Sequence, residues 1–255
     1  MILSFHKPLL MGILNLTPDS FSDGGQFANP EKALARIEEM TREGADIIDI
    51  GAQSTAGPQA LVSGEEEWRR LDPVLSKIDY SRTFVSIDTF RADVAEKALK
   101  LGVQMINDVT ALRGNARMID VLLKFKPYVC LMHSTYETPY AGNEERHFEN
   151  VMLTIKLFLK SQTEKLLEKG FPREKIIVDP GMGRFLSNNP AVSFEVIDRL
   201  AELKSLGFPI LVGHSRKGFL GGLMEERDKR TLEVSKKCLK NGANILRIHL
   251  PNSKN

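Results

Sequence analysis

The chain has 255 residues, of which 42 % are hydrophobic and 27 % charged, a balance typical of a soluble globular protein. Its formal net charge is only +2, so we expect neither a nucleic-acid nor a membrane partner. The two cysteines, Cys130 and Cys238, form no CxxC motif, and no signal-peptide pattern opens the chain, which together predict a cytoplasmic protein without a disulfide framework.

Eight short apolar runs are spaced along the chain, and each is too short for a helix. They are rich in β-branched residues and leucine, which indicates buried strands of a parallel sheet. In chain order the predicted strands are Leu9–Leu14, Ile47–Ile50, Phe84–Ile87, Gln104–Ile106, Val129–Met132, Ile176–Val178, Ile210–Val212 and Ile245–Ile248.

Amphipathic segments with helix start and stop signals separate these runs. The first begins at Asn29-Pro30 and ends before Gly44, since Asn caps helix starts and Gly follows helix ends. Further helices are predicted for Gly64–Leu75, Arg91–Leu101, Asn115–Phe125, Glu145–Lys169, Ala191–Ser205 and Arg230–Lys240.

This alternation of strands and helices, without a break in composition, predicts one domain over residues 1–255. Eight strands in about 250 residues favour a (β/α)8 TIM barrel. The alternation of strands and helices alone also permits an open doubly wound sheet. After the last strand only residues 249–255 remain, so the eighth helix is expected to be missing or very short. In that case either a partner subunit covers the first and last strands, or the chain is short or truncated there.

Polar residues follow nearly every predicted strand, at the end of a barrel where active sites form. One set suits a flat heterocycle with an amidine-like edge, because carboxylates accept two N–H donors side by side. This set is Asp88, Asn107, Asp179 and Lys217. A second set suits a phosphate and its magnesium. Its members are Asn15, Arg247 and His249. Taken singly, an Asp or Asn here could equally cap the next helix.

Several segments together resemble the dihydropteroate synthase family. The stretch Met11–Gly25 is similar to the first signature of that family. Shorter segments follow in the family order, and the resemblance extends from about Leu9 to His249. These segments are Ser86–Thr89, Ile106–Val109, Leu131–His133, Val178–Gly181, Gly213–Lys217 and Leu246–His249.

The resemblance implies that a hydroxymethyl-dihydropterin pyrophosphate and p-aminobenzoate are condensed, with release of pyrophosphate. It implies pterin binding by the first set of residues, and pyrophosphate binding by the second set with Mg2+ on Asn15. Catalytic roles fall to Asp88, Lys217 and Arg247. The loop Thr17–Gly25 is expected to close over the site. The family also tends to form homodimers.

Five positions depart from the family pattern on the side of the pyrophosphate and the acceptor: Gln53, Ala56, Arg184, Leu186 and Gly218. The acceptor is expected to bind at Thr55, Arg184 and Gly218, with Arg184 replacing the arginine missing at position 56. Two alternatives stay open at this point. The chain could be a pterin-binding paralogue with a different acceptor or no catalysis. Less in keeping with the motifs, it could be a folate-dependent methyltransferase domain.

Overall fold

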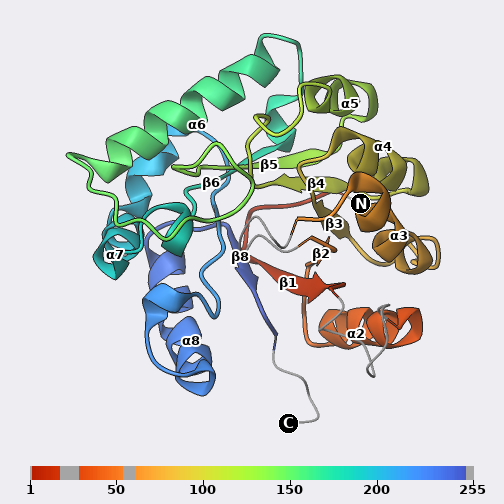
Figure 1. Cartoon of the computed structure of the whole chain (residues 1–255), viewed down its shortest axis with the longest axis horizontal. Helices are drawn as coiled ribbons and strands as arrows, with labels where there is room; N and C mark the ends of the chain where they lie inside the picture. Colours follow the sequence, from red (N-terminus) through yellow and green to blue (C-terminus); the bar gives the residue numbers. More distant parts are fainter. Residues whose placement is uncertain (1, 18–28, 54–60, 251–255) are drawn as a thin grey trace.

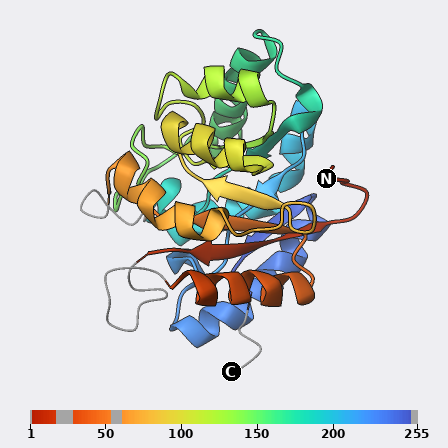
Figure 2. The same ribbon diagram turned by 90° about the vertical axis from the view of Figure 1, so that its right-hand side faces the viewer.

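A computed structural model describes residues 2–17, 29–53 and 61–250, and its eight strands form a parallel ring (Figures 1 and 2). The hydrogen-bonded order is β6-β5-β4-β3-β2-β1-β8-β7, and a parallel bridge between Val178 and Ile210 joins β6 to the start of β7. The predicted (β/α)8 barrel is therefore confirmed, and the open sheet is excluded. The strands are β1 (Leu9–Asn15), β2 (Ile47–Gly51), β3 (Val85–Asp88), β4 (Met105–Asp108), β5 (Tyr128–Met132), β6 (Ile176–Asp179), β7 (Leu211–Val212) and β8 (Ile245–Ile248).

Helices surround this ring on the outside (Figure 1). The α-helices are α2 (Pro30–Arg42), α3 (Gly64–Leu75), α4 (Ala92–Leu101), α5 (Met118–Phe125), α6 (Val151–Leu167), α7 (Pro190–Asp198) and α8 (Met224–Lys240). Short 3-10 helices are η2 (Arg173–Lys175), η3 (Gly183–Phe185), η4 (Leu200–Leu206) and η5 (Gly218–Leu220). The described part of the chain ends at Leu250, directly after β8, so the expectation of a missing or very short eighth helix falls on residues outside it and stays a prediction.

The limits of two helices differ from the prediction for local reasons. Helix α6 begins at Val151, later than predicted, because the Asn150 side chain caps it by accepting the Leu153 N–H at 3.1 Å. Helix α8 begins at Met224, earlier than predicted. There the N–H of Leu223 donates to the carboxylate of Glu226 at 2.8 Å, which satisfies one of the free donors at a helix start.

The segment predicted as one helix, Ala191–Ser205, is two helices, α7 and η4. In an unbroken α-helix the carbonyl of Ile197 would accept a hydrogen bond from residue 201. Instead it accepts one from the side-chain amide of Asn241 at 2.7 Å, and Arg199 leaves the helical conformation at φ −102° and ψ 11°. The chain therefore tightens into a 3-10 helix, which sequence periodicity does not reveal.

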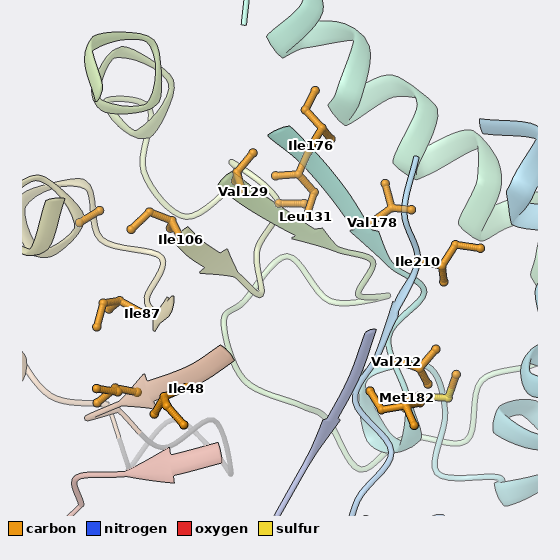
Figure 3. Packing of buried hydrophobic residues seen from close by; sticks show 14 of the residues in the cluster. Ile48, Ile87, Ile106, Val129, Leu131, Ile176, Val178, Met182, Ile210 and Val212 are labelled. Atoms are coloured by element: carbon orange, nitrogen blue, oxygen red, sulfur yellow. The ribbon is translucent and has the colours of Figure 1, made fainter. Parts of the chain in front are cut away.

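Side chains alternate between the two sides of the barrel wall along each strand. One side packs on the helices, and Figure 3 shows Ile176 and Val178 of β6 there, in a cluster that includes Ile155 and Leu159 of α6. The other side fills the barrel interior. Its amino-terminal part, hereafter the apolar layer, consists of Met11, Ile47, Met105, Cys130, Ile177, Leu211 and Ile245.

The amino-terminal segment closes the barrel below the apolar layer. Leu3 and Phe5 pack against this layer, and the N–H of Leu3 donates to the Tyr128 hydroxyl at 3.1 Å. The interior below the site is thus filled with side chains. Separately, none of the helices in the described part of the chain is both long enough and apolar enough to span a membrane.

Candidate active site

A cavity of about 440 Å³ opens at the carboxyl ends of the strands. This is the end of a (β/α)8 barrel at which active sites form. Strand ends and the loops that follow them supply its wall. The lining residues are Ile13, Asn15, Thr17, Gln53, Asp88, Ala141, Met182, Arg184, Phe185, Lys217, Gly218, Arg247 and His249.

Arg247 organises the inner end of this cavity. Its Nε donates to Asp49 Oδ2 at 2.6 Å, and its Nη2 donates to Asp88 Oδ2 at 2.8 Å. Asp49 Oδ2 also accepts the side-chain amide of Asn107 at 3.1 Å. Burial alone would lower the pKa of the guanidinium, but the two carboxylates outweigh it and the pKa of Arg247 is raised. Arg247 is therefore a fixed cation, and its plane is set by contacts on two sides.

Together with Asp179, these interior residues form what we call the polar layer: Asp49, Asp88, Asn107, Asp179 and Arg247. Strand alternation places them inside the barrel, two residues beyond apolar positions such as Met105 and Ile177. The register aligns Asp88 with Asn107 across β3 and β4. The layer is thus a direct product of sheet geometry.

Two carboxyl groups of the polar layer, Asp88 and Asp179, hold their protons more tightly than free ones do. Burial raises the pKa of Asp88 to about 7, although Arg247 opposes the shift and Asp49 adds to it. Burial likewise raises the pKa of Asp179 to about 6, against the neighbouring charge of Lys217. Both groups can therefore change protonation state near neutral pH when a ligand changes their surroundings.

Asn107 and Asp179 lie deeper than the cavity wall, at 3 % and 4 % exposure. Asp179 Oδ1 accepts the N–H of Gly181 at 2.7 Å, which fixes the turn after β6. Lys217 reaches across from the loop after β7. Its Nζ donates to the carbonyl of Met182 at 3.1 Å and lies 5.2 Å from the centre of the Phe185 ring. Burial lowers the pKa of Lys217 to about 8.

At the other side of the cavity, Asn15 ends β1 and is exposed, and His249 follows β8. The backbone N–H of His249 donates to Ser215 Oγ at 3.1 Å, and its Nδ1 lies 3.3 Å from the same oxygen. Burial, with help from Arg216 and Arg247, lowers the pKa of His249 to about 4. The imidazole is therefore neutral at pH 7 and acts as a hydrogen-bonding group rather than a cation.

The predicted acceptor side is only partly described. Arg184 lines the cavity, and its Nη1 donates to Asn143 Oδ1 at 2.6 Å. Gly218 also lines it, and a Cβ added there would have no atom within 4 Å. Thr55 and Ala56 lie outside the described residues, as does the predicted closing loop beyond Thr17.

The two remaining departures from the family pattern, Gln53 and Leu186, have structural roles in this chain. Gln53 Oε1 accepts hydrogen bonds from Arg91 Nη1 at 3.0 Å and from the Val62 N–H at 3.2 Å. Arg91 in turn forms an ion pair with the fully buried Glu67, at 2.5 Å. Leu186 is fully buried in the packing between barrel and helices. Position 186 thus contributes to the core and not to the cavity.

The sequence did not lead us to predict Asp49, which contacts both Arg247 and Asn107. A signal for it existed, because Asp49 is a single carboxylate inside an otherwise apolar strand. Met182, Phe185 and Asn143 were not predicted either. These come from irregular loops, whose side-chain directions do not follow from sequence periodicity.

Fold and cavity together define a (β/α)8-barrel enzyme with a buried, charged pocket for a small molecule. Residues 11–249 match the family model of pterin-binding enzymes. A dihydropteroate synthase of Neisseria meningitidis serogroup B is 36 % identical, over 97 % of this chain and 89 % of the relative. The chain belongs to the dihydropteroate synthase family.

Solved structures agree with this assignment. A dihydropteroate synthase of Clostridium difficile, crystallised in the presence of pteroic acid, superposes with a TM-score of 0.87 at 39 % identity, covering 98 % of this chain and 93 % of that one. The enzyme of Xanthomonas albilineans with 4-aminobenzoic acid gives a TM-score of 0.87 at 34 % identity, covering 97 % of this chain and 89 % of that one.

Proposed function

We propose that this chain is a dihydropteroate synthase of folate biosynthesis. It condenses 6-hydroxymethyl-7,8-dihydropterin pyrophosphate with p-aminobenzoate and releases pyrophosphate. The observation that carries the proposal is the contact of Arg247 with both Asp49 and Asp88 inside the cavity, beside Lys217. This arrangement offers carboxylates to a heterocycle and cations to an anion within one pocket.

In this proposal the pterin lies on the polar layer. Asp88 and Asp179 accept N–H groups of the pterin, and the side-chain amide of Asn107 offers both a donor and an acceptor. Lys217 donates from the opposite side. The buried position of these groups supports the assignment, because each carboxylate has more acceptor sites than its protein partners occupy, and a polar ligand can use the remaining ones.

The pyrophosphate lies toward Asn15, Arg247 and His249. Mg2+ commonly takes one or two protein ligands and completes its shell with phosphate oxygens and water. The donor set fits this pattern, since Asn15 presents an amide oxygen and the described residues contain no cluster of three His, Cys, Asp or Glu side chains. Asn15 would hold the ion, which supplies charge neutralisation for the departing pyrophosphate.

In the reaction the bond between the pterin methylene carbon and the pyrophosphate oxygen breaks. A bond from the aromatic amine nitrogen to that carbon forms, and the amine loses one proton to water. Arg247 stabilises the negative charge that develops on the leaving group, and Asp88 and Lys217 keep the pterin in line. These three residues are the proposed catalytic residues.

The acceptor lies at Thr55, Arg184 and Gly218. Arg184 is exposed at the cavity wall and offers a guanidinium to the acceptor carboxylate. Its hydrogen bond to Asn143 steadies it there. Because position 56 is alanine, Arg184 supplies the positive charge on this side.

A pyrophosphate-release assay tests the function. The purified protein receives the dihydropterin pyrophosphate and Mg2+, with and without p-aminobenzoate. We expect release that depends on p-aminobenzoate. Pterin binding in a calorimeter without such release would contradict the proposal and favour a pterin-binding paralogue.

The role of Arg184 has its own test. We expect Arg184→Ala to raise the KM for p-aminobenzoate about tenfold, since one charge-assisted hydrogen bond is lost. The KM for the pterin substrate should stay unchanged. Unaltered turnover at low p-aminobenzoate would contradict the assignment.

We further propose a cytoplasmic homodimer formed by one domain over residues 1–255. Exposed apolar side chains on α7, on α8 and at the start of α8 support a self-association surface: Phe194, Leu223, Met224 and Leu232. Analytical ultracentrifugation tests it, and Leu232→Glu should shift the protein to monomer. A wild-type monomer at micromolar concentration would contradict it.

A further inference from the structure

The face of α8 that packs on the barrel is unusually polar. Thr231 and Ser235 are 4 % and 8 % exposed, and Asp228 precedes them on the same side of the helix. Helices of a barrel normally pack apolar side chains on the strands, because a buried polar group needs a partner. Each of these three residues has its partner in the segment 214–216, directly before Lys217.

His214 is the first partner, and it is fully buried. Its Nε2 lies 2.9 Å from Ser235 Oγ and 3.2 Å from the carbonyl of Thr231. The Ser235 hydroxyl already donates to that same carbonyl at 2.7 Å. A carbonyl can only accept, so His214 Nε2 carries the proton and donates to both oxygens. Burial also lowers the pKa of His214 to about 4, which keeps the ring neutral.

Arg216 is the second partner. Its guanidinium makes two parallel hydrogen bonds to Asp228, at 2.7 and 3.1 Å, and its backbone N–H donates to Thr231 Oγ1 at 3.3 Å. Arg216 has φ +59°, a left-handed conformation that is unfavourable for a residue with a side chain. Such strain persists where surrounding contacts enforce it, and it concentrates at functional sites.

Lys217 directly follows this strained residue. Its N–H donates to the carbonyl of His214 at 3.3 Å, so residues 214–217 form one tight turn. The direction in which Lys217 leaves the turn depends on the conformation of Arg216. In the structure that direction carries Nζ to the carbonyl of Met182 and the ring of Phe185, inside the cavity.

We propose that Asp228, Thr231 and Ser235 are positioning residues for Lys217. They hold the turn 214–217 in the one conformation that directs the Lys217 ammonium into the pocket. The conformation of this turn does not depend on which substrate the pocket binds. Its consequence for pterin binding rests on the proposed function.

Two variants test the proposal in the full-length protein. Asp228→Ala removes the partner of Arg216 at a half-exposed position and keeps a good helix former there. The double variant His214→Leu/Ser235→Ala replaces both partners of the buried hydrogen bond with apolar groups, a change that is close to neutral for stability. Lys237→Ala is the matched control, because it breaks the ion pair that α8 makes with Asp198, away from the turn.

Two readouts separate positioning from a purely structural role. The first is the rate at which acetic anhydride modifies Lys217, followed across pH by mass spectrometry. The second is the Kd of the dihydropterin pyrophosphate, measured by calorimetry. We expect both test variants to move the Lys217 titration toward the ordinary, higher lysine pKa and to weaken pterin binding about tenfold, the effect of one lost charge-assisted hydrogen bond. Lys237→Ala should change neither.

An unchanged Lys217 titration in both test variants, with only a lower melting temperature, would overturn the proposal. In that case the polar residues of α8 would stabilise the packing of the helix and would not position Lys217. If the double variant does not fold, Asp228→Ala decides the question, since its ion pair is at the surface. A wild-type protein without p-aminobenzoate-dependent turnover would refute the proposed function, and the Lys217 titration would still test the turn.

Discussion

The apolar and polar layers of the barrel interior lie on the same strands and differ in almost every physical property. On β6, Ile177 and Asp179 point to the same side two residues apart, and on β8 Ile245 and Arg247 do the same. The first of each pair packs against apolar neighbours. The second carries a charge. One strand therefore contributes stability at one inward position and binding chemistry at the next.

The polar layer, together with the neighbouring Lys217, is held at a cost in free energy. Burial raises the pKa values of Asp88 and Asp179 and lowers that of Lys217, so each charged form is disfavoured where it lies. The charge of Arg247 offsets part of this penalty for Asp88, and the opposite charges of Asp179 and Lys217 offset part of it for each other. Groups kept in such surroundings are typical of sites selected for function and not for stability. Substitutions in the two layers should accordingly have opposite effects.

The largest effect is expected for Lys217→Met. It removes a buried ammonium that contacts the cavity, and turnover should fall about a thousandfold, as for other groups that stabilise charge in a reaction. The melting temperature should change by only about 4 °C or less, because an apolar chain of similar length replaces a buried charge. Pyrophosphate release and calorimetric melting measure the two quantities. A large loss of both turnover and melting temperature would contradict the distinction between a site that supports function and an apolar layer that supports stability.

The opposite pattern is expected for Ile177→Ala in the apolar layer. Removing a fully buried side chain should lower the free energy of unfolding by about 2–5 kcal/mol, through lost burial and the cavity left behind. The KM values of the folded enzyme at 25 °C should be unchanged. Urea unfolding and steady-state kinetics make the comparison. A raised KM for the pterin would mean that the two layers are mechanically coupled.

A smaller effect concerns pH and Asp179. Its pKa is raised from 3.8 to about 6 in the folded protein, so its contribution to stability is present below pH 3.8 and is lost as pH rises through about 6. Asp179→Asn cannot titrate. The free energy of unfolding of wild type relative to this variant should therefore fall, by up to about 3 kcal/mol, between pH 4 and 7. Parallel curves from urea unfolding would show that Asp179 titrates normally.

The smallest effect is expected for Gly218→Ser at the cavity wall. An added side chain there meets no atom within 4 Å, so the free energy of unfolding should change by less than about 0.5 kcal/mol. The new hydroxyl should lower the KM for p-aminobenzoate by about two- to tenfold, the usual range for one hydrogen bond. Lys217→Met serves as the inactive reference in the same assay. A higher KM would place the acceptor elsewhere.

Much of the architecture could be predicted from the sequence, because the eight strands are buried on both sides and form short apolar runs. The position of Asp88, Asn107 and Asp179 at strand ends was also predictable, since each follows directly from its run. The break between α7 and η4 was not. It depends on Asn241, which is distant in sequence and whose side-chain amide donates a hydrogen bond to the carbonyl of Ile197.

Within the site, the predicted residues that the structure describes line the cavity or lie just beneath it. Their proposed roles stay predictions. Asp49 was not predicted because it lies at an inward position within its apolar run, whereas the predicted residues follow their runs. The link from Arg184 to Asn143 could not be foreseen, because it joins two irregular loops that only the folded chain brings together.

The packing of Leu3 and Phe5 beneath the apolar layer has a kinetic consequence. Because side chains fill the barrel at its amino end, the cavity opens only at the carboxyl ends of the strands in the described part of the chain. Both substrates and both products therefore pass through the same opening. In the proposed binding mode a pterin on the polar layer occupies the deeper position, and an acceptor beside Arg184 lies nearer to the opening. We therefore expect an ordered sequence, in which the pterin enters before the acceptor and an acceptor that binds early blocks the way.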